Sequence, residues 1–266
     1  MAIRSGWSSD ERKLWMRNFH PPTPGAPRLL CLPHAGGSAS FFFPVSAALS
    51  PDVNVLAVQY PGRQDRRAEP YADSVEALAD ALLGVLDPRD DTPLALFGHS
   101  MGAVVGFELA RRLEAAGRPP AVLFASGRRA PSLVRADGTV HRRDDAGLIE
   151  EMRKLDGTDL ALLDDPEMLR LILPAIRADY RLVETYRRAP GQRLSCPVVA
   201  MTGDADPRVT LDEARSWGAE TSGAFELLVH PGGHFYLVPR HRTVNAQIQE
   251  YLRRLAPRTR AEVAAP

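Results

Sequence analysis

A serine between two glycines is the first candidate for chemistry in this chain. The apolar run Leu94 to Phe97 leads into Gly98-His99-Ser100-Met101-Gly102, and a helical pattern follows at once. An apolar strand that turns sharply into a helix holds a serine on a strained elbow, with its hydroxyl exposed at the helix N-terminus. The motif therefore predicts that Ser100 is a nucleophile.

A serine hydroxyl needs a base to take its proton, and the base needs a carboxylate to orient it. In folds with this elbow the acid comes next along the chain, on a loop after a strand. The run Val198 to Met201 leads into such a loop, which carries Asp204 and Asp206. We favour Asp206, because its longer reach carries it past the strand end, and we expect Asp204 to cap the turn.

Two histidines follow the last apolar run, Phe225 to Val229, and compete for the role of base. His230 ends that run directly. The Gly232-Gly233 pair lets the backbone approach closely and turn His234 toward the serine, so we favour His234. His99, inside the elbow, is expected to pack beneath it.

Acyl transfer also needs backbone N–H groups aimed at the developing oxyanion, each worth about 3 kcal/mol. One is expected from Met101, immediately after the serine. The run Leu29 to Leu32 ends in a glycine-bearing loop at 33–38, where the N–H of Ala35 is the candidate second donor. The loop could instead be a plain glycine turn or a phosphate cradle, but no Gly-Lys-Ser/Thr element or dinucleotide fingerprint follows it.

Apolar runs alternate with amphipathic segments along most of the chain. This alternation predicts an α/β fold with a mainly parallel sheet covered by helices on both faces. A further segment, 14–19, is expected to add an edge strand. A helix is expected to begin near Ser74, with Asp73 and Glu76 as an acidic cap, and another to end at Gly117. The predicted strands are 29–32, 53–58, 94–97, 121–125, 198–201 and 225–229.

The alternation breaks between 131 and 190, where amphipathic helices follow one another without a strand. Pro166 opens the longest helix, and Pro174 is expected to kink or interrupt it. The pattern predicts a helical lid at 131–190 inserted into a core made of 1–130 and 191–266. Its alternative is a structural cap that only covers apolar surface. The segment 256–266 is expected to be a frayed tail.

The charge and residue composition of the chain argue against some classes of binding partner. The 33 basic and 33 acidic residues among 266 cancel, so no net field attracts nucleic acid or an anionic membrane. No signal peptide and no apolar run of membrane-spanning length is evident, so we expect a cytoplasmic monomer of one catalytic unit, with no nucleic-acid or membrane partner. Cys31 and Cys196 suggest neither a disulfide nor a zinc site, and both are expected to be buried.

Taken together, the motifs resemble those of the type II thioesterases, free-standing enzymes of the α/β-hydrolase fold that accompany modular polyketide synthases and nonribosomal peptide synthetases. The resemblance runs from about 28 to 240. It is carried by 32–38, 60–63, 98–102, 126–131, 177–180 and 231–235.

The resemblance implies an acyl or peptidyl carrier protein as partner, with the acyl group held as a thioester on its phosphopantetheine arm. The reaction would release a free acid and clear aberrant or stalled acyl units, without a metal or organic cofactor of the enzyme's own. The family's nucleophile, acid and base fall on Ser100, Asp206 and His234, and its amide donors on Ala35 and Met101. The insertion would be a mobile lid.

Several residues keep two interpretations. The arginines at 63, 128 and 129 could hold the carrier protein or the phosphate of its arm, or be solvated or internal braces. The phenylalanines at 41, 42 and 43 could line the acyl chamber or pack in the core. Three alternative functions stay open. A carboxylesterase or small lipase would use the same catalytic residues on an oxygen ester, and a chain-terminating thioesterase domain severed from a synthase is a second possibility. A non-catalytic relative, the third, would be expected to lack a member of the triad.

Overall fold

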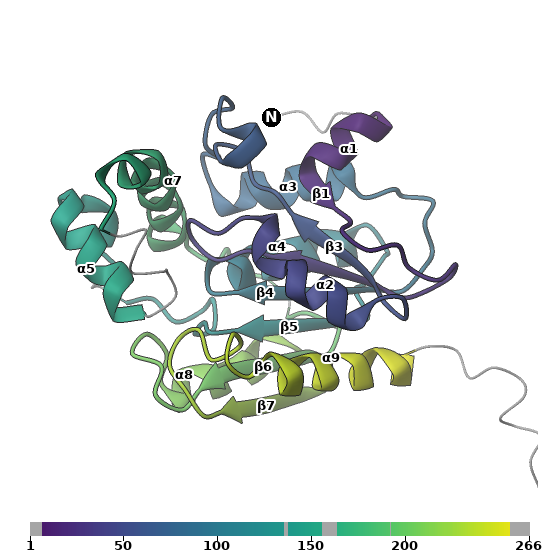
Figure 1. Ribbon diagram of the computed structural model, residues 1–266. Helices are drawn as coiled ribbons and strands as arrows, with labels where there is room; N and C mark the ends of the chain where they lie inside the picture. The colour runs from purple at the N-terminus through teal and green to yellow at the C-terminus, as the bar shows by residue number, and fades with distance from the viewer. Residues whose placement is uncertain (1–6, 136–137, 156–163, 192, 256–266) are drawn as a thin grey trace, which may run out of the picture.

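The computed structural model describes residues 7–135, 138–155, 164–191 and 193–255. Its centre is a seven-stranded sheet with the order β1-β3-β2-β4-β5-β6-β7 (Figure 1). β1 pairs antiparallel with β3, and the remaining neighbours pair in parallel. The strands are β1 (Met16–Arg17), β2 (Arg28–Leu32), β3 (Asn54–Val58), β4 (Leu94–His99), β5 (Val122–Ser126), β6 (Val198–Gly203) and β7 (Phe225–His230).

Burial along the central strands explains why they are continuous apolar runs. Every residue of β2, β4, β5 and β6 is buried, as expected when helices cover both faces of a parallel sheet. The predicted α/β class and its main strands are confirmed. The predicted edge strand is shorter than expected, because a capping box between Ser8 and Glu11 starts helix α1 (Ser9–Trp15) and leaves only β1 extended.

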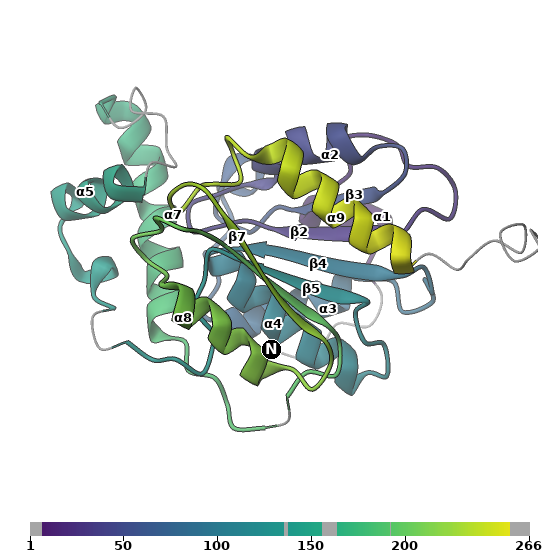
Figure 2. The same cartoon turned by 90° about the horizontal axis from the view of Figure 1, so that it is seen from below.

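Helices form a layer on each face of the sheet, and each layer encloses its own hydrophobic core (Figure 2). The helices α2 (Phe43–Leu49) and α9 (His241–Leu255) lie on one face, while α3 (Val75–Val85), α4 (Met101–Ala115) and α8 (Leu211–Arg215) lie on the other. Neighbouring residues of β4 therefore enter different cores: Leu96 packs on the α4 side and Phe97 on the α9 side.

The ends of the predicted helices follow local signals. The Ser74 hydroxyl accepts a hydrogen bond from the N–H of Ala77 at 3.1 Å, so Ser74, not Asp73, caps α3. Gly117 follows α4 with a φ of 73°, the left-handed conformation that ends many helices.

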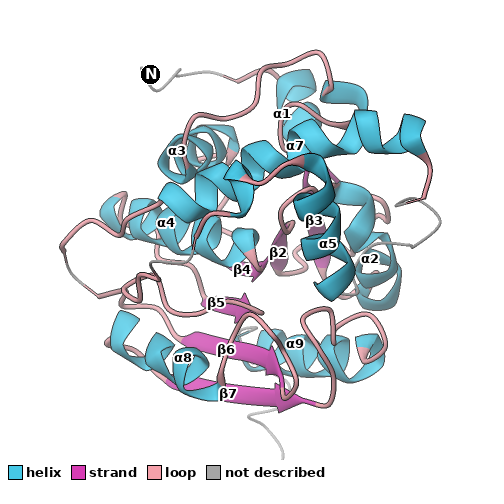
Figure 3. Cartoon of the chain, turned by 90° about the vertical axis from the view of Figure 1, so that its left-hand side faces the viewer, coloured by secondary structure: helices cyan, strands magenta, loops and turns pink. Residues whose placement is uncertain are grey.

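Two described helices of the insertion, α5 (Asp145–Leu155) and α7 (Pro166–Thr185), lie beyond the carboxyl ends of the parallel strands (Figures 1 and 3). α7 begins at Pro166 as predicted and runs without interruption through the exposed Pro174, which leaves a kink as the remaining expectation there. A small hydrophobic cluster joins α5 to α7 as far as Tyr180, whereas Leu182 and Val183 near the C-terminal end of α7 belong to the main core. The predicted tail at 256–266 lies outside the described residues.

Candidate active site

Ser100 stands between β4 and α4 on a strained turn, with φ 53° and ψ −112°. A β-carbon on Gly98 would lie 2.2 Å from the carbonyl oxygen of Gly102, and one on Gly102 would lie 2.0 Å from that of Leu32. Real side chains never approach backbone so closely, so glycine is required at both positions. The backbone N–H of Ser100 donates to the Ser126 carbonyl at 2.8 Å, which fixes the elbow to β5.

The loops after β6 and β7 bring one acid and one histidine together. Nδ1 of His234 lies 2.9 Å from Oδ2 of Asp206, and both side chains are buried. The other carboxylate oxygen of Asp206 accepts the N–H of Arg208 at 2.8 Å. Asp204 instead accepts the N–H of Gly232 at 2.9 Å and so ties the two loops to each other. Asp206 thus faces the ring, whereas Asp204 links the two loops and does not cap its own turn in the way expected.

Contacts of the His234 ring place it beside the elbow. Its centroid lies 5.1 Å from that of His99, the residue before Ser100. Its Cε1 lies 3.4 Å from the β-carbon position of Gly127, which follows the carbonyl that holds the Ser100 N–H. Because Asp206 engages Nδ1, Nε2 is the ring nitrogen left for a proton from a serine. The three predicted residues therefore gather at the same end of the sheet.

A buried chain of hydrogen bonds lies next to the serine elbow at this end of the sheet. His99 is fully buried, and its Nδ1 lies 3.0 Å from the Ser126 hydroxyl, which lies 2.7 Å from the hydroxyl of Tyr236. Burial lowers the pKa of His99 well below its ordinary value, and the neighbouring His234 and His34 lower it further. His99 is thus a neutral packing residue at pH 7, as expected from its place in the motif.

The remaining candidate histidine, His230, has a different environment. Its ring stacks on Tyr236, with centroids 4.9 Å apart and an angle of 9° between the planes. Burial lowers its pKa, and the Arg240 charge adds to that effect. Since Asp206 binds the other histidine, His230 serves the packing of the loop.

The loop at 33–38 lies against the start of α4. A β-carbon on Gly102 would meet the carbonyl oxygens of both Leu32 and Pro33, so the first helical residue, Met101, sits next to this loop. The N–H groups at the start of a helix have no partner within it. In the loop, the N–H of Gly36 donates to Asp179 and that of Gly37 to the His34 carbonyl, and the N–H of Ala35 takes part in neither bond.

The structure gives different environments to the residues for which the sequence left two interpretations. Arg63 is buried and bonded to Asp179, which makes it an internal brace. Arg128 donates to the Val183 carbonyl at 3.5 Å, and burial together with the charges of Arg129 and Arg208 lowers its pKa to about 9.

Among the phenylalanines, Phe42 is fully buried in the core on the α9 side, and Phe43 is 49% exposed. Phe41 packs against His34 with ring centroids 4.7 Å apart, so it is the one that approaches the candidate site. Both cysteines are buried and unpaired, as predicted.

Asp179 lies in 177–180, one of the segments that carry the family resemblance, but the sequence analysis assigned it no role. It lies on the buried face of α7, among Ile176, Tyr180 and Val183. A carboxylate in the apolar stripe of an amphipathic helix has to find a partner, and that position was the available signal.

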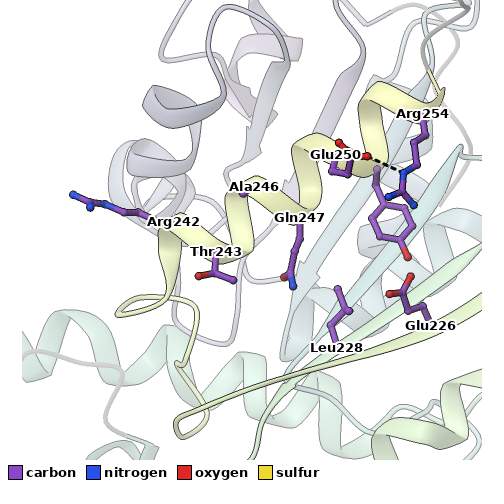
Figure 4. Close-up of a pocket in the computed structure, with 9 residues that line it drawn as sticks. Glu226, Leu228, Arg242, Thr243, Ala246, Gln247, Glu250 and Arg254 are labelled. Atoms are coloured by element: carbon purple, nitrogen blue, oxygen red, sulfur yellow. Dashed lines mark hydrogen bonds and ion pairs between the residues drawn. The ribbon is translucent and has the colours of Figure 1, made fainter.

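A groove between β7 and α9 contains none of these residues (Figure 4). Its walls include Glu226 near the start of β7 and the ion pair between Glu250 and Arg254, with N and O 3.0 Å apart. It therefore lies away from the strand end that carries His234. Within the described residues, no helix is long and apolar enough to cross a membrane, and no group of three or more His, Cys, Asp or Glu side chains could hold a metal ion.

Comparison with known sequences adds independent information. Residues 27–252 match the model of the thioesterase domain family. The chain is 51% identical to the thioesterase PikA5 of Streptomyces venezuelae over 241 residues, which cover 90% of this chain and 85% of that protein. It is 48% identical over 245 residues to a probable cadicidin biosynthesis thioesterase of Streptomyces griseus, covering 92% of this chain and 68% of that protein.

Solved structures of type II thioesterases are also similar to this chain. The type II thioesterase BorB from the borrelidin biosynthetic cluster superposes with a TM-score of 0.85 at 53% identity, covering 90% of this chain and 98% of that one. YbtT, a type II thioesterase from the yersiniabactin pathway, superposes with a TM-score of 0.80 at 31% identity, again covering 90% of this chain and 98% of the other.

Proposed function

The chain belongs to the thioesterase domain family and is a type II editing thioesterase of polyketide and nonribosomal peptide assembly lines; we propose that it removes acyl groups from carrier proteins through Ser100, His234 and Asp206. The observation that carries this assignment is the buried bond, 2.9 Å long, between His234 and Asp206 beside the strained serine elbow. It orients the ring with Nε2 available to the serine hydroxyl.

In the first half-reaction, Nε2 of His234 takes the proton of Ser100 as its oxygen attacks the thioester carbonyl. The tetrahedral intermediate collapses, the carbon–sulfur bond breaks, and the pantetheine thiol leaves with a proton from the imidazolium. In the second half, a water molecule gives its proton to the same nitrogen and attacks the acyl-serine. The bond from the acyl carbon to the serine oxygen then breaks, the imidazolium returns its proton to that oxygen, and the free acid leaves. Asp206 stabilises the imidazolium in both halves.

The developing oxyanion is assigned to the N–H groups of Met101 and Ala35. The Met101 N–H opens α4, where the helix dipole also favours negative charge. The Ala35 N–H is supported by the bonds that occupy its neighbours Gly36 and Gly37. Such N–H donors stabilise the oxyanion because they already point at the oxygen when its negative charge develops.

The segment 131–190 is proposed as the lid of the acyl chamber. Its hydrophobic cluster packs against Ala35, which ties it to the oxyanion loop. Since Leu182 and Val183 near the C-terminal end of α7 belong to the main core, we assign the movement of the lid to the α5 side. Carrier proteins are the proposed partners, and a cytoplasmic monomer the proposed state.

The assignment is tested with Ser100→Ala and the exposed control Ser132→Ala, assayed on one acyl group presented on a carrier protein, on a small thiol and as an oxygen ester. We expect Ser100→Ala to lose about 10⁴-fold or more in turnover with an unchanged melting temperature, and the control to match the wild type. Wild-type turnover by Ser100→Ala would disprove the mechanism. A preference for the oxygen ester would disprove the substrate class.

A further inference from the structure

The helix α7 is joined to the oxyanion loop by a buried ion pair from a third segment. Arg63 follows β3, and its two terminal nitrogens lie 2.6 and 2.9 Å from the two carboxylate oxygens of Asp179. The same carboxylate accepts the N–H of Gly36 at 2.7 Å, and Arg63 also donates to the Gly37 carbonyl at 3.2 Å. Asp179 thus holds the N–H of Gly36, and its partner Arg63 holds the carbonyl of Gly37.

Packing strengthens the same connection. Gly36 has a φ of 75°, and a β-carbon there would lie 2.4 Å from Cγ1 of Ile176 on α7. The backbone of the loop is therefore in direct contact with the helix. A shift of α7 would change the conformation of the residue that follows Ala35.

The ion pair is well suited to hold this position. Arg63 is 8% exposed and Asp179 is 1% exposed, so water cannot replace either partner. Burial alone would lower the pKa of Arg63, but the charge and hydrogen bonds of Asp179 raise it above its ordinary value, so the guanidinium stays charged. Bidentate pairing of arginine with a carboxylate also fixes the orientation of both groups.

We propose that Asp179, held by Arg63, is a positioning residue that sets the oxyanion loop and makes catalysis depend on the placement of α7. The inference rests on the proposed function, because it concerns the N–H of Ala35 as an oxyanion donor. Asp179 touches neither the substrate nor the nucleophile in this assignment. Together with Arg63, it acts through the N–H of Gly36 and the carbonyl of Gly37.

The test compares Asp179→Asn with the wild type in kinetics and in binding of two inhibitors that carry the same acyl chain. A trifluoromethyl ketone adds to the serine and places an oxyanion in the hole, whereas a pantetheine amide binds only as a ground-state mimic. We expect kcat and ketone affinity to fall together by about 10- to 100-fold, with KM and amide affinity within about threefold of wild type. A generally loosened fold would weaken both inhibitors.

Asp145→Asn is the matched control, because Asp145 on α5 pairs at 2.5 Å with Arg177 on α7, the helix that carries Asp179, away from the loop. It should leave all four measurements unchanged. If Asp179→Asn unfolds, the double variant Arg63→Met with Asp179→Leu replaces the buried pair by apolar groups and still removes the acceptor of Gly36.

Unchanged kcat and ketone affinity in either folded variant would overturn the proposal, and so would equal loss of both inhibitors. Failure of the proposed function gives a different result. In that case the wild-type enzyme itself would bind the ketone no better than the amide.

Discussion

The candidate site has two walls that are built differently. The sheet wall comprises the serine elbow and the loops after β6 and β7, and its parts meet backbone to backbone. A β-carbon on Gly203 would lie 2.2 Å from the Gly232 carbonyl oxygen, much as Gly102 meets Leu32. The cap wall comprises α5 and α7, and it is held by charged side chains: Asp179 with Arg63, and Glu151 with Arg208 at 2.9 Å.

This difference predicts different tolerance to change. Where backbone meets backbone there is no room for an added atom. The sheet wall therefore holds the reacting groups firmly, but only glycine is accepted at its contact positions. An ion pair with a partly exposed partner, such as Glu151 with Arg208, can be weakened while the surrounding helices keep their packing. The groups proposed for catalysis therefore stand on the wall that tolerates the least change, and the proposed lid on the wall that tolerates more.

The largest expected effect concerns the two carboxylates of the sheet wall. Asp206→Asn should lower kcat by about 10² to 10⁴-fold, because the amide no longer stabilises the imidazolium or fixes its tautomer. Asp204→Asn is the control, since an amide oxygen can still accept the Gly232 N–H. Steady-state hydrolysis of an acyl carrier protein measures both. A larger loss in the Asp204 variant would reverse the assignment.

Gly102→Ala probes the backbone contact itself. Its β-carbon would overlap the Leu32 carbonyl, so we expect a loss of about 3 kcal/mol in the free energy of unfolding, measured with urea. Gly233→Ala is the control within the same wall, because nothing lies within 4 Å of its β-carbon position. Equal stability of the two variants would show that the elbow can relax.

Buried neutral histidines should make the sheet wall sensitive to acid. Folding lowers the pKa of His99 from 6.5, so the unfolded chain binds more protons below that pH. The stability is complete above pH 6.5 and is lost as the pH falls, by up to about 1.4 kcal/mol per pH unit. In urea titrations between pH 7 and 5, His99→Gln should show a shallower decline than wild type. An identical slope would mean that His99 is already charged in the fold.

The smallest effect is expected in the cap wall. Glu151→Gln weakens the links from α5 to Arg208 and Arg143, which are both partly exposed, and should cost about 1 kcal/mol of stability. Its acyl-chain selectivity should change more than its kcat. Glu150→Gln is the control, since that exposed residue pairs only with Lys154 on its own helix in the described structure. A loss of stability as large as that of Gly102→Ala would remove the distinction between the walls.

Much of the sheet wall could be predicted from residues that are neighbours in the chain. Apolar runs mark the strands, and the glycines on either side of Ser100 mark the elbow. The choice of Asp206 over Asp204 followed from reach along the loop, and that of His234 over His230 from the two glycines before it. The hydrogen bond between Asp206 and His234 agrees with both choices. The prediction was less accurate at the chain start, where a local capping box extended a helix into the expected edge strand.

The sequence by itself determined the order of the candidate catalytic groups and the strands that carry them, because burial periodicity and glycine requirements act over a few residues. Only the tertiary structure decided what the cap wall holds. Arg63 and Asp179 are 116 residues apart in the chain, and nothing near either one specifies the other. Their pairing arises because a carboxylate on the buried face of α7 must be neutralised where that helix meets the oxyanion loop.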